Sequence, residues 1–569
     1  MRDVVKIENL SYFYPYSEVA VLDHINLSIK EGEIVVLTGP TGSGKTTLCL
    51  TLNGVIPHIL GGKLDGRVLV DGMDVLEHDV AELSTKVGIV FQSPDVQLFS
   101  SSVISEIAFG PENLAIPREE IRERVSWAME LTGLKGYEER SPAKLSDGEK
   151  RKVAIASILA MRPKIIVLDE PTTGLDSIEA KRVISLIESL RNKYRTTFLI
   201  VEHREHILRL ADRILLMVDG KILGECKPRD LFDDEKLMNS AYIRVPEVVK
   251  LFHLLRKEGI YRGRIPLTVE EALPVISRVP IAPSTVKSCN APKDPRANEE
   301  LIRMERVSCG YGKQEVIKEV NVKINKGEFL ALVGRNGAGK TTLAKCMVGL
   351  IKPSNGRILL QGRDIRDMNI ADISPIISYI FQNPERQFFS MSVEEEVSFG
   401  PRNLGLSEEE INERVEESLR SVNLIHLKEK HPRSLSRGQM QRLAIAIALA
   451  MRPQAIILDE PMTGQDEASL RSIEMILRKL REEGKTILLI THEMGLVSRL
   501  ADRVIALANG RIVFDGPTRK FFWDERAVIE AGIGFPPLVQ LLRNLPDPSR
   551  FEGIVTAEEF IEAIRGRGK

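Results

Sequence analysis

The chain has 569 residues, of which 28% are charged and 43% are hydrophobic, a composition ordinary for a globular protein and too apolar for a disordered one. At about 100–200 residues per domain, this length predicts three to five folding units. Lys plus Arg number 79 against 80 for Asp plus Glu, a net charge of −1. This balance argues against a protein that lives on nucleic acid, because such proteins normally carry a basic excess.

The sequence shows neither a membrane span nor a secretion signal. No stretch approaches the ~20 consecutive apolar residues that cross a bilayer, and the start, MRDVVKIENL, has no apolar signal core. The chain is therefore expected not to span a membrane, which leaves binding through a membrane partner open. Scattered cysteines without a C-x-x-C pair predict a reduced, cytosolic compartment and no zinc or iron–sulfur site; they are Cys49, Cys226, Cys289, Cys309 and Cys346.

In the first half, short apolar runs end in glycine or acidic turns, as buried parallel strands do. These runs are residues 33–39, 164–170 and 196–203. Between them Ile121, Val125 and Met129 fall at a spacing of four, which predicts an amphipathic helix. Strands that alternate with helices predict an α/β fold with a parallel-rich sheet and a helical subdomain.

The second half repeats the first. GPTGSGKTT begins at Gly39 and GRNGAGKTT at Gly334, an offset of 295, while LSDGE at Leu145 and LSRGQ at Leu435 lie 290 apart. The apolar runs recur at residues 328–334, 454–460 and 486–492, and the helical spacing recurs at Ile411, Val415 and Leu419. Landmarks at a nearly constant separation indicate a tandem duplication.

The duplication extends into a small helical appendix after each nucleotide-sized domain. Each appendix has a helix start with Thr three residues before Glu, at Thr268 and Thr556, so that each side chain satisfies an orphaned backbone N–H. The intervening segment is rich in Pro, Asn and Lys and reads as a linker. The predicted division is domain 1 at 3–236, appendix 1 at 237–280, linker at 281–300, domain 2 at 301–525 and appendix 2 at 526–569.

The pattern G-x-x-x-x-G-K-[ST] between a strand and a helix predicts a phosphate cradle. Its backbone N–H groups point at phosphate oxygens, and the helix N-terminus adds positive potential. Lys45 and Lys340 are expected to reach the β- and γ-phosphates, and Thr46 and Thr341 to hold Mg²⁺. The predicted nucleotide contacts are Gly39, Thr41, Gly42, Gly44, Lys45, Thr46 and Thr47, and in the second half Gly334, Asn336, Gly337, Gly339, Lys340, Thr341 and Thr342.

A pair of carboxylates ends one apolar strand in each half. Asp169 and Asp459 are expected to orient the Mg²⁺ shell, and the following Glu170 and Glu460 to polarise the attacking water. Hydrolysis of a γ-phosphate needs both charge neutralisation and an oriented nucleophile, so the sequence predicts two hydrolytic sites.

These motifs, with L-S-x-G-[QE], a Gln after a strand and a later His, resemble the ATP-binding cassette (ABC) ATPases, and the resemblance covers the chain twice. SYFYPY offers four aromatic candidates for the first adenine contact, so a core or surface role for its tyrosine stays open. The resemblance implies Mg²⁺ contacts by Gln92 and Gln382, γ-phosphate contacts by His203 and His492, and adenine stacking by Tyr14 and Tyr311.

ABC domains work as head-to-tail pairs, in which a helix N-terminus of one domain faces the γ-phosphate of the other. The resemblance therefore implies that residues of each half complete the cradle of the other half. The completing residues are Ser436, Gly438 and Gln439 for the first cradle, and Ser146 and Gly148 for the second.

The signature motif departs from the family pattern. Asp147 and Arg437 stand where the family usually has glycine, and Glu149 replaces the usual Gln. Because an Asp repels phosphate and an Arg attracts it, the site built from Lys340 and Ser146 is expected to be the weaker one, unless the side chain points away. Both halves keep the Lys, Asp, Glu and His set, so neither site is expected to be dead.

F-Q-x-P-x-x-Q-[LF]-F, at Phe91 and Phe381, and F-G-P-x-N-L resemble the ATPases of energy-coupling factor (ECF) importers of vitamins or of cobalt and nickel. The resemblance implies ATP and Mg²⁺ as cofactors, an integral-membrane T component and a substrate-binding S component. Arginines of the T component would pair with Asp95 and Glu385. One chain per transporter is expected, peripheral on the cytoplasmic face of the cell membrane.

Two other functions remain open. One is the ATPase of an ordinary ABC importer, although such fused pairs often have one degenerate half. The other is a soluble twin-cassette ABC protein that acts on ribosomes, although such proteins typically carry a charged helical arm and a basic surface. DNA-repair ABC ATPases usually carry zinc modules or coiled coils, neither of which is seen in the sequence.

Overall fold

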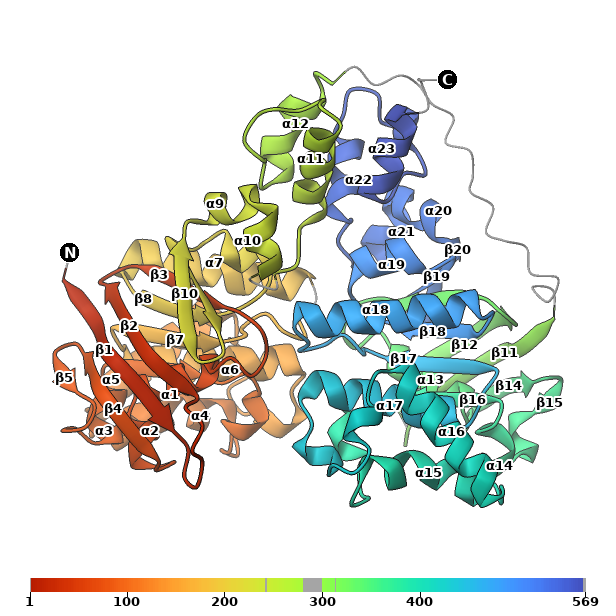
Figure 1. Ribbon diagram of the computed structural model, residues 1–569, viewed down its shortest axis with the longest axis horizontal. Coiled ribbons are helices and arrows are strands. Elements are labelled where there is room, and N and C mark those ends of the chain that lie inside the picture. Colours follow the sequence, from red (N-terminus) through yellow and green to blue (C-terminus); the bar gives the residue numbers. More distant parts are fainter. Residues whose placement is uncertain (1, 176, 241–242, 280–298, 313, 566–569) are drawn as a thin grey trace. The chain divides into compact units, whose positions relative to one another are not determined.

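The computed structural model divides into two compact units, Met1–Val245 and Pro246–Lys569. Each unit is described by itself (Figure 1). The expected linker at 281–300 falls outside the described residues except for its last two positions. The described residues are 2–175, 177–240, 243–279, 299–312 and 314–565.

The first unit contains an antiparallel sheet, ordered β2-β1-β4-β5, and a six-stranded sheet, ordered β10-β9-β3-β8-β7-β6. Five strands of the larger sheet are parallel and β10 is an antiparallel edge, which confirms the expected parallel-rich α/β fold. The strands are β1 Asp3–Phe13, β2 Leu22–Lys30, β3 Ile34–Thr38, β4 Lys63–Val70, β5 Met73–Asp74, β6 Val87–Val90, β7 Ile165–Asp169, β8 Thr197–Val201, β9 Arg213–Val218 and β10 Lys221–Cys226.

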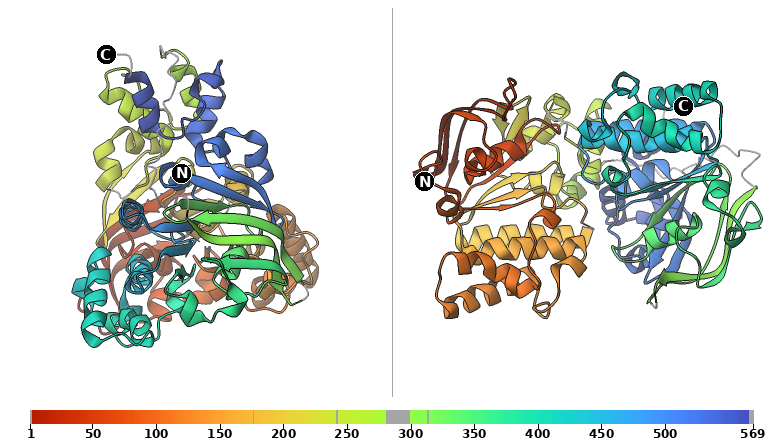
Figure 2. Two further views of the ribbon diagram at one scale, coloured as in Figure 1. Left: turned by 90° about the vertical axis from the view of Figure 1, so that its right-hand side faces the viewer. Right: turned by 90° about the horizontal axis from the view of Figure 1, so that it is seen from below.

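Helix α1 packs between these two sheets, as the right-hand view of Figure 2 shows. Its Leu48 and Leu52 are fully buried in one cluster with Val5 of β1 and Val35 of β3. The helices are α1 Lys45–Leu52, α2 Val55–His58, α3 Val80–Ser84, α4 Val103–Asn113, α5 Arg118–Thr132, α6 Asp147–Met161, α7 Ser177–Tyr194, α8 Glu205–Leu208, α9 Pro228–Asp233 and α10 Glu235–Ser240.

The second unit repeats both sheets, ordered β12-β11-β14-β15 and β16-β17-β18-β13-β19-β20. Its edge strand β20 is again antiparallel to its neighbour. The strands are β11 Glu300–Tyr311, β12 Gln314–Asn325, β13 Phe329–Val333, β14 Asn355–Leu360, β15 Arg363–Asp364, β16 Ile377–Ile380, β17 Ala455–Asp459, β18 Thr486–Ile490, β19 Arg503–Ala508 and β20 Arg511–Pro517.

Helices cover the larger sheet of the second unit as they do in the first. Among the described residues, no helix is both long enough and apolar enough to cross a bilayer. The helices are α11 Glu247–Lys257, α12 Val269–Ile276, α13 Lys340–Met347, α14 Ile370–Ile373, α15 Val393–Asn403, α16 Glu408–Ser421, α17 Arg437–Ala450, α18 Glu467–Glu482, α19 Met494–Leu500, α20 Thr518–Trp523, α21 Glu525–Glu530, α22 Pro537–Arg543 and α23 Ala557–Arg565.

The helices of both appendices pack together inside the second unit. Helix α11 contacts α22 and α23, and α12 contacts α22, side by side in Figure 1. Lys250 of α11 and Glu558 of α23 form an ion pair at 2.6 Å. Helices this short need tertiary packing to be stable, which explains the association. Segment 237–280 thus places α10 in the first unit and α11 and α12 in the second; the domain boundaries remain predictions.

Candidate functional site

The first phosphate cradle is the loop between β3 and α1. The side chain of Lys45 is buried, and its Nζ donates to the carbonyl oxygens of Gly39 at 2.8 Å and Pro40 at 2.7 Å. Gly39 has φ 145°, and a Cβ there would lie 1.8 Å from the carbonyl oxygen of Met217. A larger residue is therefore excluded at the start of this loop, and the amino group of the lysine is held against the loop backbone.

The second cradle, between β13 and α13, has the same geometry. Lys340 Nζ donates to the carbonyl oxygens of Gly334 at 2.8 Å and Arg335 at 3.0 Å. At Gly334, where φ is 149°, a Cβ would lie 2.3 Å from the carbonyl oxygen of Leu507. Both halves of the chain thus build the same loop against the neighbouring strand of the sheet.

In the first half, a threonine and an aspartate lie where a cation beside the phosphates would be held. Thr46 Oγ1 donates to Asp169 Oδ2 at 2.8 Å. Burial raises the pKa of Asp169, and the hydrogen bond from Thr46 and the charge of Lys45 act against that rise. Binding of a cation is expected to favour the ionised form of Asp169, because the cation adds positive charge beside the carboxylate.

In the second half, Thr341 Oγ1 donates to Asp459 Oδ2 at 2.8 Å and Tyr379 donates to the same oxygen at 2.7 Å. Asp459 Oδ1 is buried and has no hydrogen-bond partner among the described residues. No group of three His, Cys, Asp or Glu side chains in that described part is arranged to hold a metal by itself. One carboxylate and one hydroxyl fit Mg²⁺, which usually completes its shell with phosphate oxygens and water.

Glu170 follows β7 and is the candidate for the residue that polarises water in the first half. Its Oε2 accepts from Gln92 Nε2 at 2.6 Å and from Thr173 Oγ1 at 3.0 Å. Burial, followed by the charges of Glu202 and Asp169, raises the pKa of Glu170 to about 7. A carboxylate with a pKa near the working pH suits general-base chemistry.

Glu202 is a buried acid that the motifs did not single out. It accepts from Thr172 Oγ1 at 2.5 Å and from the backbone N–H of His203 at 2.9 Å. Burial opposes its ionisation, but the charge of Arg204 and these hydrogen bonds hold the pKa of Glu202 below its ordinary value. The residue before the second histidine is Thr491, so the extra carboxylate is a feature of the first half.

The two histidines have different partners. His203 Nδ1 lies 3.2 Å from Thr38 Oγ1 at the end of β3. His492 Nδ1 lies 2.8 Å from Glu460 Oε2, so the second half places its histidine directly beside its candidate catalytic carboxylate. Both histidines therefore lie at the carboxyl edge of the sheet, where the cradles are.

Arg151 of α6 is a second residue that no motif indicated. Its buried guanidinium donates to the backbone carbonyl of Glu170 and, at 2.9 Å, to that of Gln92. It thereby joins α6 to the two segments that carry the candidate metal and water ligands. The duplicate position holds Gln441, whose buried Nε2 has no hydrogen-bond partner within the described residues.

The signature serines begin α6 and α17. Ser146 accepts from the backbone N–H of Glu149, whose carboxylate accepts from the backbone N–H of Ser146 at 2.8 Å. Ser436 and Gln439 make the same reciprocal pair in the second half. Glu149 thus replaces glutamine without loss of the capping box.

The signature glycines allow close packing of each signature helix on the next one. A Cβ at Gly148 would lie 2.4 Å from a carboxylate oxygen of Glu179, and one at Gly438 would lie 2.1 Å from Ser469 Oγ. The side chains next to these glycines differ between the halves. Asp147 is exposed, while the guanidinium of Arg437 lies 2.4 Å from the place that a Cβ at Gly464 would take. Arg437 therefore turns back over a loop of its own half. The expected difference in strength between the two nucleotide sites remains a hypothesis.

Some predicted residues make no contact in these sites. The side chains of Gln382 and Tyr311 are exposed and make no hydrogen bond in the part of the chain that the structure describes. Tyr14, in contrast, hydrogen-bonds Thr47 Oγ1 of the first cradle at 3.2 Å and packs edge-to-face on Tyr12. The roles of all the site residues, and the completion of each cradle by the other half, remain predictions.

Comparisons with known proteins show which proteins this chain resembles. A family model described as ABC transporter matches residues 22–173 and 317–463. A Methanosarcina mazei protein, provisionally described as an ABC transporter ATP-binding protein, is 41% identical over 99% of this chain and 97% of its own length. A Clostridium perfringens protein with the same description is 32% identical over 99% of both chains.

Two solved structures resemble parts of the chain. CbiO1 from Clostridium perfringens, described as part of the ABC transporter complex cbiONQ, is 34% identical over 44% of this chain and 100% of its own, with a TM-score of 0.39. The ATP-binding cassette MJ0796, in a dimeric post-hydrolysis state with ADP and Pi, is 30% identical over 40% and 99%, with a TM-score of 0.36. The family model and the two full-length relatives show that the chain belongs to the ABC transporter family, and its two cassettes are ATP-binding, ATP-hydrolysing domains.

Proposed function

We propose that this chain is the ATPase of an ECF-type importer of a vitamin or a transition-metal ion such as cobalt or nickel. The two cassettes bind ATP between them, and their closure moves an integral-membrane T component that works with a substrate-binding S component. One chain serves one transporter, at the cytoplasmic face of the cell membrane. The observation that carries the proposal is an exposed aromatic and acidic surface that occurs in both halves.

In the first half this surface follows Gln92. Asp95 lies in the short 3₁₀ helix Pro94–Val96. Phe99, which is 67% exposed, packs edge-to-face on the exposed ring of Phe109 with a centroid distance of 4.7 Å. Solvent-exposed aromatic clusters of this kind mark protein interaction sites.

The second half has the same surface, with Glu385 in the 3₁₀ helix Pro384–Arg386 and an edge-to-face pair of Phe389 and Phe399, again at 4.7 Å. A buried glutamate holds the loop in each half. Glu396 accepts from the backbone N–H of Phe389 at 3.0 Å and Ser390 at 2.8 Å. Glu106 does the same for Phe99 and Ser100. Two matched surfaces fit a partner that presents two similar helices.

The acids of the two surfaces differ in their local partners. Asp95 forms an ion pair with Lys150 of α6 at 2.6 Å. The duplicate of Lys150 is Met440, and the exposed Glu385 forms no ion pair among the described residues. A partner arginine therefore competes with Lys150 at the first surface, and we expect Glu385 to contribute more to docking than Asp95 does.

The residues of each site have separate tasks in this function. Thr46 with Asp169, and Thr341 with Asp459, would hold Mg²⁺, which would supply charge neutralisation at the phosphates. Lys45 and Lys340 bind the β- and γ-phosphates, and Glu170 and Glu460 accept the proton of the attacking water. The histidines orient the γ-phosphate. Hydrolysis removes this phosphate, and the loss of the phosphate reopens the pair of cassettes.

The experiment is co-purification of the tagged chain from detergent-solubilised membranes. These membranes contain the membrane proteins that are encoded next to the gene of this chain. The double variant Asp95→Arg with Glu385→Arg is expected to lose at least about 90% of a membrane partner, because two charge-assisted pairs become repulsive at a partly desolvated interface. Glu119→Arg with Glu409→Arg is the matched control, since these exposed acids also lie 290 residues apart.

The control variant is expected to retain the membrane partner and the ATPase activity of the chain. Unchanged recovery of the membrane partner with the first double variant would refute the docking assignment. Recovery of ribosomal RNA in place of membrane proteins would favour the ribosome-associated alternative.

A further inference from the structure

A cavity of about 460 Å³ lies in the first unit, at the edge of the large sheet opposite the candidate active site. Pro163 and Lys164 precede β7 here and Thr196 precedes β8, whereas Asp169 and His203 lie at the other ends of these strands. The volume falls within the roughly 300–1,000 Å³ of small-molecule sites. The cavity is therefore separate from the nucleotide site and large enough for a small ligand.

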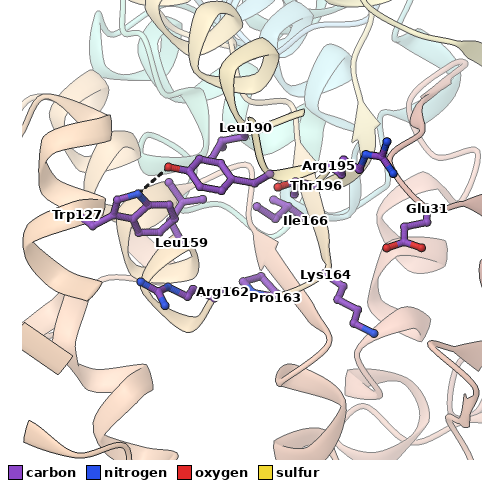
Figure 3. Close-up of a pocket in the computed structure, with 11 residues that line it drawn as sticks. Glu31, Trp127, Leu159, Arg162, Pro163, Lys164, Ile166, Leu190, Arg195 and Thr196 are labelled. Carbon is purple, nitrogen blue, oxygen red and sulfur yellow. Dashed lines mark hydrogen bonds between the residues drawn. The ribbon is translucent and has the colours of Figure 1, made fainter. Parts of the chain in front are cut away.

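One end of the cavity is aromatic. Trp127 of α5 and Tyr194 of α7 pack edge-to-face, with ring centroids 5.5 Å apart. The indole Nε1 donates to the hydroxyl oxygen of Tyr194 at 3.1 Å, which fixes both rings (Figure 3). Tyr194 is 51% exposed, and Trp127 is half-buried. Two rings held in this way offer a rigid surface for a planar ligand.

Cations line the rest of the cavity. The guanidinium of Arg162 makes a cation–π contact with the Trp127 ring, 5.5 Å from the ring centroid. In the view of Figure 3, Arg162 is drawn lower than Trp127. Lys164 and Arg195 also line the cavity, and Lys164 Nζ pairs with Asp71 at 2.8 Å. Glu31 is the one acid among the described residues that line it. Among the described residues neither Arg162 nor Arg195 forms an ion pair, so both are available to an anion.

The duplicate cassette lacks this combination. The position of Trp127 is taken by Glu417, which pairs with Arg452, the duplicate of Arg162, at 2.8 Å. Residues 482–485, which replace the turn at Tyr194, contain no aromatic residue. The second half thus neutralises the cation that the first half leaves beside an aromatic ring. This difference is the reason to assign a ligand to the first half.

We propose that this cavity binds a planar aromatic anion, a ring that carries a carboxylate or a phosphate. The ring stacks beside Trp127 and Tyr194, and the charge pairs with Arg162, the cation that lies at the Trp127 ring. Both parts of the ligand contribute, because the aromatic wall is apolar and the guanidinium of Arg162 has no acidic partner within the described part of the chain.

The test uses the full-length chain with both cradles saturated by Mg²⁺ and a non-hydrolysable ATP analogue. The probes are 2-naphthoate, its uncharged analogue 2-naphthamide, and cyclohexanecarboxylate, which has the charge without the aromatic ring. Equilibrium dialysis is expected to show 2-naphthoate binding at least about tenfold more tightly than either analogue. Equal binding of all three probes, or none by 2-naphthoate at millimolar concentration, overturns the proposal.

Variants locate the binding. Trp127→Glu recreates in the first half the Glu417–Arg452 pair of the duplicate cassette. Because the duplicate cassette folds with that pair, the variant is expected to fold. Its affinity for 2-naphthoate is expected to fall at least about tenfold. Arg162→Gln should weaken 2-naphthoate and leave 2-naphthamide unchanged. Glu417→Trp is the matched control and should leave affinity unchanged. If Trp127→Glu, with an unchanged melting temperature, binds 2-naphthoate as the wild type does, the site lies elsewhere and the proposal fails.

Discussion

At the scale of single residues, the duplication provides internal comparisons, because the same fold carries different side chains at matched positions. Glu202 lies beside the first candidate active site, and Thr491 takes its place in the second. The negative charge of Glu202 adds to burial in raising the pKa of Glu170 to about 7. The first site is therefore expected to respond to pH within the physiological range.

We expect the Glu460→Gln variant, in which turnover depends on Glu170, to lose kcat/KM as the pH falls through about 7. A raised carboxyl pKa means that the water-polarising carboxylate is protonated below that pH, and kcat/KM reports the free enzyme. Adding Glu202→Gln removes one raising charge and should move the acid limb to lower pH. The measurement is a pH–rate profile of ATP hydrolysis; identical limbs for the two variants would contradict the role of Glu202.

At the scale of elements, the appendix helices show how short amphipathic helices become stable. Helix α11 belongs by sequence to the first half but buries its apolar face in the second unit, with α22 and α23. Glu247 at its start also pairs with Arg499 of α19 at 3.2 Å. The first half is thereby tied to the second through helices that lie outside its own cassette.

Phe252→Ala in α11 is expected to loosen α22 and α23, because a fully buried aromatic truncation costs about 3–5 kcal/mol and leaves a cavity in this small cluster. Hydrogen exchange measured by mass spectrometry should rise in the peptides that cover residues 537–565. Phe232→Ala is the matched control, since Phe232 is equally buried but lies in α9 of the first unit. Faster exchange in 537–565 with the control alone would contradict the predicted coupling.

At the scale of the whole molecule, the proposed function requires each cradle to be completed by the signature serine of the other half. Ser146 and Ser436 are both exposed at the starts of their helices. Such N-termini carry a partial positive charge that suits a γ-phosphate. The arrangement predicts which variants act on the same site.

Ser436→Arg is expected to abolish the turnover that depends on Glu170. Adding Glu170→Gln to it should therefore cost little more, whereas Ser146→Arg with Glu170→Gln should remove activity from both sites. The measurement is a double-mutant cycle of ATP hydrolysis rates. Ser407→Arg controls for loss of a helix cap, since Ser407 caps α16 in the same way and a cap is worth about 0.5–2 kcal/mol. Fully additive losses for Ser436→Arg and Glu170→Gln would refute head-to-tail sites.

Local sequence patterns determined the duplicated α/β fold, both phosphate loops and the strand-end carboxylates. These features could be read because strand burial, glycine turns and helix caps depend on neighbouring residues, and the loops at Gly39 and Gly334 lie between the expected strands and helices. The family followed from the order of these motifs along the chain, which the matched residues 22–173 and 317–463 support.

Only the tertiary structure decided which distant residues meet. The contact of Arg151 with Gln92 spans 59 positions, and Tyr379 reaches Asp459 across 80. The same holds for the packing of α11 on α23 and for the cavity beside Trp127. No local pattern encodes such contacts, because they depend on how sheets and helices are stacked; side chains far apart in sequence become neighbours only once the apolar faces of the elements are buried.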